Sequence, residues 1–156
     1  MGPQLSIYND TNTELVNSWN IGTLKAQIPS EVLTINIWNN KGGSTTVSDL
    51  KEAYLMVLDN TGDTALMDIP RDKWVQANVP NIDGNTITWT PIGGTAGKDL
   101  KGNSISLENA ISGKSNDGVA ANSPENVCTV NLRVVAPPNA DPGDKFFKIR
   151  ITGYFT

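Results

Sequence analysis

The sequence contains no histidine, a single cysteine and only 18% charged residues, and each shortage removes a class of function. Without histidine, the chain can build neither a Ser–His–Asp or Cys–His catalytic centre nor an ordinary zinc site. With Cys128 as the one cysteine, no disulfide can form within the chain. We therefore predict a non-enzymatic protein with no catalytic residue, no metal and no cofactor.

Long apolar runs and basic clusters are also missing. No run approaches the ~20 apolar residues that a membrane-spanning helix needs. Residues Met1–Ser6 show neither the charged nor the apolar region of a signal peptide. The 12 basic and 16 acidic residues give a formal net charge of −4 and are scattered along the chain. We therefore expect a soluble protein that binds neither nucleic acid nor membrane.

Short apolar runs separated by Gly, Pro, Asn and Asp are abundant, which is the pattern of an all-β protein. The clearest alternation of apolar and polar residues lies in Val32–Trp38, Val127–Val135 and Phe146–Phe155. The start of Val47–Leu58 is ambiguous, and one interpretation of Ser48–Ala53 is a short helical turn capped by Ser48. Further strands are expected at Leu5–Tyr8, Tyr54–Leu58, Ala65–Ile69, Trp74–Val79 and Thr86–Trp89.

The inward-facing residues of the three clearest strands should form one contiguous, nearly buried core. Cys128 shares a face with Val130, so we interpret it as a buried small hydrophobic residue rather than a nucleophile. The last two strands are expected to pair through the proline-rich loop Ala136–Asp144 and to form the centre of a sheet. The predicted core residues are Leu33, Ile35, Ile37, Val130, Leu132, Val134, Phe147, Ile149 and Ile151.

A length of 156 residues fits one domain, 1–156, with a long polar excursion at about 95–125. Hairpin loops usually need only ~2–5 residues, so the excursion is longer than folding alone requires. Its composition is too polar for a second core. We predict that the excursion and Met1–Asn12 contact neighbouring subunits, and that the domain folds without most of the excursion.

Two segments resemble known families. Val130–Phe155 contains a strand, then Pro-x-Asn-Ala-x-Pro-Gly at 137–143, then an alternating strand, and resembles the closing hairpin of bacterial immunoglobulin-like modules. Ser30–Gly43 and Thr90–Gly94 resemble small structural proteins of tailed bacteriophages. These resemblances imply an immunoglobulin-like antiparallel β-sandwich. They also imply a virion component, either a capsid decoration or a tail or baseplate accessory, assembled in the bacterial cytoplasm in multiple copies beside neighbouring virion subunits.

Four tryptophans are many for this length. Alternation turns Trp38 away from the Leu33, Ile35 and Ile37 face, and Trp89 ends a predicted strand. Outward aromatic residues serve as interface anchors or as platforms for sugar rings. Trp38 and Trp89 are therefore the candidate ligand or interface residues, and the alternative function is a carbohydrate or cell-surface binding module. The competing interpretation is that the tryptophans cap the ends of the core.

Oxygen-rich loops leave calcium binding open, because calcium takes oxygen ligands such as those of Asp and Asn. Asp, Asn and Gly are also the ordinary turn residues. None of these loops follows the EF-hand spacing. The stretch Gly93–Asp99 resembles a phosphate loop only superficially, since Asp99 stands where Ser or Thr is required. The oxygen-rich loops are 59–63, 81–85, 115–118 and 141–144.

Overall fold

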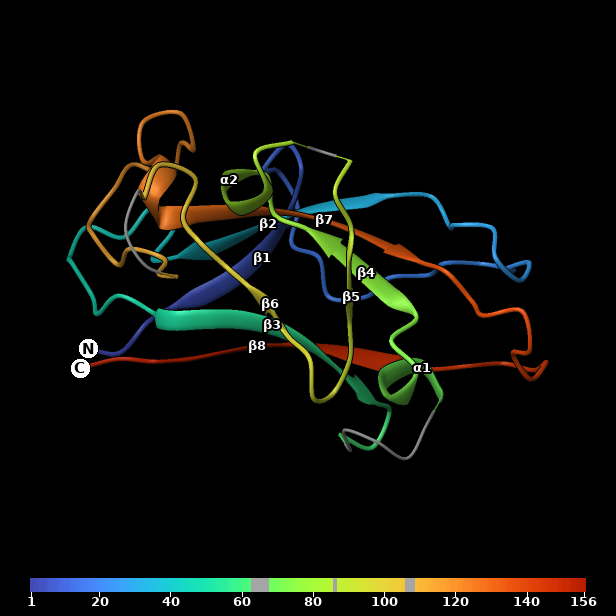
Figure 1. The fold of residues 1–156 in the computed structure, drawn as a ribbon. Helices are drawn as coiled ribbons and strands as arrows, with labels where there is room; N and C mark the ends of the chain where they lie inside the picture. Colours follow the sequence, from blue (N-terminus) through green and yellow to red (C-terminus); the bar gives the residue numbers. More distant parts are fainter. Residues whose placement is uncertain (63–67, 86, 106–108) are drawn as a thin grey trace.

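The computed structural model describes residues 1–62, 68–85, 87–105 and 109–156, which form two antiparallel β-sheets in two layers (Figure 1). One sheet has five strands in the order β1-β2-β7-β4-β5, and the other has three in the order β6-β3-β8. The all-β prediction is thereby confirmed. The strands are β1 (Leu5–Asn9), β2 (Leu33–Asn39), β3 (Lys51–Asp59), β4 (Val75–Asn78), β5 (Thr90–Ile92), β6 (Lys98–Asp99), β7 (Val127–Val134) and β8 (Phe147–Tyr154).

Helical structure is limited to short turns in the described part of the chain: α1 (Asp68–Arg71), α2 (Pro80–Asp83) and the 3-10 helix η1 (Pro124–Asn126). None of these helices is long and apolar enough to cross a membrane.

Three local predictions were wrong where the structure describes them. A strand was expected at 65–69. Residues 65–67 lie outside the described ranges, and Asp68 and Ile69 belong to α1 instead. The strand expected at 86–89 is displaced to β5, Thr86 again lying outside them. No helical turn forms at 48–53. Leu50 makes an isolated β-bridge with Ile111, and β3 begins at Lys51 with an irregularity before Tyr54. Leu50 and Ala53 are both buried.

The core lies between the sheets and is centred on β2 and β7. These strands pair antiparallel, with Ile35 opposite Val130 and Ile37 opposite Cys128. The predicted core residues on both strands are buried, with the exception of the half-buried Leu33. Phe147, Ile149 and Ile151 face the same interior, as predicted, but they remain partly exposed.

The closing hairpin is the main error of topology. β7 lies at the centre of the five-stranded sheet, whereas β8 is an edge strand of the three-stranded sheet. The proline-rich loop between them therefore crosses from one layer to the other (Figure 1). Alternation gave the correct face of each strand, but two alternating strands can pair with each other or with different partners.

Strands that alternate apolar and polar residues commonly leave one face of an antiparallel sheet in water, yet much of the outer face of the five-stranded sheet is covered. Asn36 is buried, and its amide nitrogen donates to the backbone oxygens of Asn9 and Asp10. Asn131 is buried as well and donates to Oδ1 of Asn78. Hydrogen bonds of this kind offset the cost of removing polar groups from water.

The excursion at 95–125 is built into the fold. Leu100 and Ile111 are fully buried in the core, and Ile111 forms a β-bridge with Leu50. The buried amide of Asn126 donates to the backbone oxygens of Asn39, Ser112 and Lys114. The prediction that the domain folds without this segment is therefore corrected, because Leu100 and Ile111 belong to the core and Asn126, just after the segment, is hydrogen-bonded to its backbone.

Candidate functional site

One side of the two-layer structure is open, between the edge strands β1 and β8. On β3, Leu55 and Val57 are fully buried, but their partners on β8, Ile151 and Ile149, are partly exposed. The five-stranded sheet shows the same gradient, because Ile37 is fully buried and its partner Ile7 on β1 is not. We call the strip between β1 and β8 the open side.

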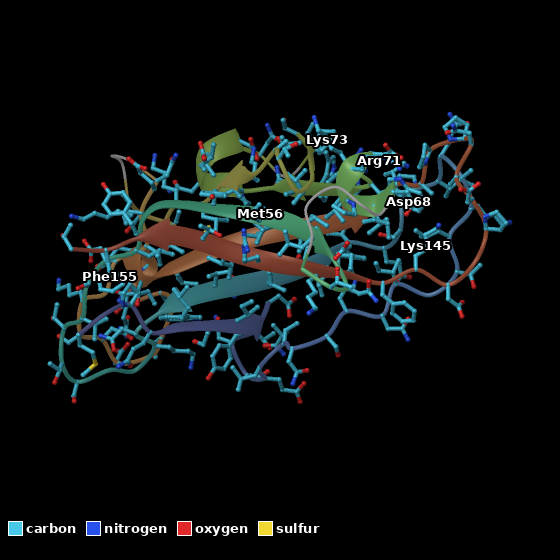
Figure 2. All side chains as sticks on the ribbon, turned by 90° about the horizontal axis from the view of Figure 1, so that it is seen from below. Met56, Asp68, Arg71, Lys73, Lys145 and Phe155 are labelled. Carbon is cyan, nitrogen blue, oxygen red and sulfur yellow. The ribbon has the colours of Figure 1, made fainter. Side chains whose placement is uncertain are left out.

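The opposite side is closed by the chain that enters β6. The backbone N–H of Val57 donates to the oxygen of Gly93 across the gap between the sheets, and Leu100 is held on Ala53 by a 2.8 Å hydrogen bond. Five strands therefore face three. The uncovered width lies at β1, where Ile7 is only partly buried, whereas Ile35 and Ile37 of β2 are buried. In Figure 2, β1 and β2 emerge beside β8 on the side away from β3.

A cleft of about 1200 Å³ occupies one end of the open side. Its floor is apolar and comes from both sheets, with Ile7 and Ile35 from one and Phe147 and Ile149 from the other. A smaller hollow at the other end is lined by Leu5, Ile151 and Phe155, among others. Lys145 and Phe155 mark the two ends of this side in Figure 2.

Residues 16–26 cover part of the cleft without forming a strand. Val16, Trp19, Ile21 and Leu24 pack against the core, and the ring of Trp19 meets that of Phe147 edge to face at 5.9 Å. Within the described residues, no backbone hydrogen bond joins this segment to β8. The segment shields the cleft but leaves the edge of β8 unpaired.

The back of the cleft holds one buried polar group that has no hydrogen-bond partner among the described residues. Trp74 is 5% exposed and lines the cleft, and its Nε1–H has no acceptor among the described residues. Lys145 lies over the Trp74 ring at 5.5 Å and forms a 2.7 Å ion pair with Oδ2 of Asp68. An acceptor entering the cleft would complete the hydrogen bonding of the Trp74 indole.

The outer face of β8 is basic, although the chain is acidic overall. Lys148 and Arg150 are exposed, and neither has a carboxylate partner in the described part of the chain. The guanidinium of Arg150 instead lies against Sδ of Met56 at 3.1 Å. The open side therefore combines an unpaired strand edge, an apolar floor and two unpaired cations.

Neither candidate tryptophan lies on the open side. Trp38 does face away from the core, as predicted, but it is fully buried, and its Nε1–H donates to Oδ1 of Asn12 at 2.7 Å. The expectation of an accessible Trp38 is therefore corrected, because the turn after β1 folds over it. Trp89 is half-buried, with the Arg133 guanidinium 4.4 Å from its ring.

The other candidate groups have structural partners. Cys128 is fully buried, as predicted, and burial raises the pKa of its thiol to about 12. Lys98, in the stretch compared with a phosphate loop, is buried in an ion pair with Asp83. Asp59 and Asp117 accept hydrogen bonds from residues of their own turns, which lowers the pKa of Asp117. Asp63, in the first oxygen-rich loop, lies outside the described residues.

No protein-family model, curated protein or solved structure matches this chain. The site therefore rests on its own geometry. Neither Lys148 nor Arg150 is among the candidate residues that the sequence indicated. Two cations on one face of a strand, with no acid between them, were the signal that could have marked the surface.

Proposed function

We propose that this protein is a non-enzymatic assembly protein, a component of a tailed-bacteriophage virion that docks on neighbouring subunits through its open side. The observation that carries the proposal is the uncovered apolar floor between β1 and β8. An apolar surface beside an unpaired strand edge is costly in a free monomer and is typical of a protein–protein interface. The N-terminal residues predicted to contact neighbours include β1, which borders this side.

The immunoglobulin-like classification and the virion location belong to the same proposal. Two packed antiparallel sheets support the classification, whereas the separation of β7 and β8 into different sheets departs from the usual arrangement of the closing strands. The virion location rests on the sequence resemblance to phage structural proteins. Accessible aromatic platforms would favour the carbohydrate-binding alternative, and the burial of Trp38 leaves that alternative with Trp89 alone of the two candidates.

The test is incorporation into particles. Tailed particles from cells that carry the gene are purified by density, and the protein is quantified by mass spectrometry. We expect several copies in each particle. Phe155→Ser, on the open side, should remain folded and lose incorporation, whereas Ile87→Ser should be incorporated normally. Phe155 is 56% exposed and Ile87 is 81% exposed, but Ile87 lines neither hollow. A protein found only in the free fraction would refute the virion role.

A further inference from the structure

We propose that β8 accepts an extended segment of a partner polypeptide in which apolar residues alternate with acidic residues. The inference rests on the proposed docking function and names its chemistry. The partner segment would add a fourth strand to the three-stranded sheet and lie over the uncovered floor of the other sheet. This is strand addition, in which backbone hydrogen bonds supply affinity and alternate side chains supply specificity.

The strand edge provides the first requirement. β8 runs for eight residues, Phe147–Tyr154, and in the described structure its ladder is with β3 alone. In an antiparallel ladder, alternate residues turn their N–H and C=O groups away from the partner strand. These groups form a row along the free edge of β8, and a partner strand of similar length would pair with them.

The apolar floor provides the second requirement. Side chains of the added strand alternate between the two faces of the sheet. Those facing inward would meet Ile149 and Ile151 of β8 and Ile7 of β1, which are among the inner-face residues left partly exposed. The cleft of about 1200 Å³ beside them has room for several side chains. The inward positions of the partner are therefore apolar.

The charges on β8 indicate which residue types suit the outward positions of the partner strand. The outward row of β8 begins with Lys148 and Arg150, which have no carboxylate partner among the described residues. Opposite charges on neighbouring strands are favourable and like charges are unfavourable. Glutamate or aspartate at the outward positions of the partner would lie beside these two cations, so the pattern of the partner is apolar alternating with acidic.

The same charges argue against a second copy of this chain as the occupant. A twofold pairing of two β8 strands centred on Ile149 would place Lys148 of one copy opposite Arg150 of the other. Basic residues on an edge strand also protect against pairing between identical edges. The partner is therefore a different polypeptide, and the isolated protein is expected to be a monomer.

The experiment uses two fluorescein-labelled peptides of about nine residues, the length of strand that spans β8. One alternates valine with glutamate and the other alternates valine with lysine, and both are capped at their ends. We expect the full-length protein to bind the glutamate peptide at least about tenfold more tightly than the lysine peptide. Hydrogen exchange should show new protection in residues 147–154.

Charge reversal provides the matched comparison. The variant Lys148→Glu/Arg150→Glu should reverse the preference between the peptides, whereas Lys73→Glu/Lys114→Glu should leave it unchanged. Both control lysines are exposed and line neither hollow. Thermal unfolding verifies that each variant is folded. If the double variant does not fold, the single variant Lys148→Glu replaces it, because this variant keeps the contact of Arg150 with Met56.

Three results would overturn the inference: equal affinity for the two peptides, new protection confined to residues outside 147–154, or a dimer whose interface contains β8. The outcome is separable from that of the proposed function. Particles that incorporate the protein while β8 binds neither peptide would leave the assembly role standing and remove strand addition. If the protein binds the peptide but is absent from particles, strand addition stands and the virion role is removed.

Discussion

The ammonium nitrogen of Lys98 lies 2.8 Å from Oδ1 of Asp83, and the two side chains are only 10% and 9% exposed. Lys98 begins β6, in the smaller sheet, and Asp83 ends α2, which packs on β7 of the larger sheet. Thr90 lies 3.0 Å from the same ammonium, and Oδ2 of Asp83 accepts the backbone N–H of Val79. The ion pair therefore joins the two layers on the closed side.

Breaking this pair should be costly, because the remaining charge stays buried without a partner. Lys98→Met is expected to lower the free energy of unfolding by about 3–5 kcal/mol, and Asp83→Asn by a similar amount. The double variant should lose less than the sum of the two, since neither charge remains. Urea denaturation of all four proteins measures this coupling. Additive losses would show that the two side chains do not interact.

The excursion should contribute to stability through its buried residues and not through its surface. Ile111 is fully buried, so Ile111→Ala is expected to cost about 2–5 kcal/mol. Val119 lies in the same segment but is 49% exposed, and Val119→Ala should stay within about 0.5 kcal/mol of the unchanged protein. Equal effects in chemical denaturation would mean that the segment is not part of the core.

Because one side of the interior is open, an Ile→Ala substitution should cost different amounts of stability at different core positions. Ile37→Ala, at a fully buried position, should cost about 2–5 kcal/mol. Ile149→Ala should cost about half as much, because part of its side chain already contacts water in the folded protein. The free energies of unfolding are measured on the protein alone by chemical denaturation. An added strand would bury Ile149 and raise the cost of the Ile149→Ala substitution.

The thiol of Cys128 should make stability fall at alkaline pH. Burial raises its pKa from 9.0 to about 12, so the unfolded chain loses this proton first. The contribution is complete below pH 9 and is lost between about pH 9 and pH 12, by up to about 4 kcal/mol. Cys128→Ala removes the group, and its melting temperature should decline less steeply over this range. Parallel declines for both proteins would contradict the assignment.

The sequence determined the class of the fold and the face of the three clearest strands. Alternation is a local property with a period of two residues, so it correctly placed Ile35, Ile37, Val130 and Leu132 inside and Lys148 outside. It also identified Cys128 as a core residue, because the neighbouring apolar positions fix its face. These conclusions need no knowledge of which strands are neighbours.

The tertiary structure alone decided which strands pair and which groups meet. β7 and β8 have equally regular patterns but lie in different sheets, because strand pairing depends on contacts between distant segments. Trp38 is inaccessible because the turn that contains Asn12 lies over it. Lys98 contacts Asp83 because the two layers pack together. The open side has the same origin. Five strands face three, so part of the larger sheet is left uncovered beside β1 and β8. This gap follows from the number and order of strands in each sheet, and no local sequence pattern specifies that number or that order.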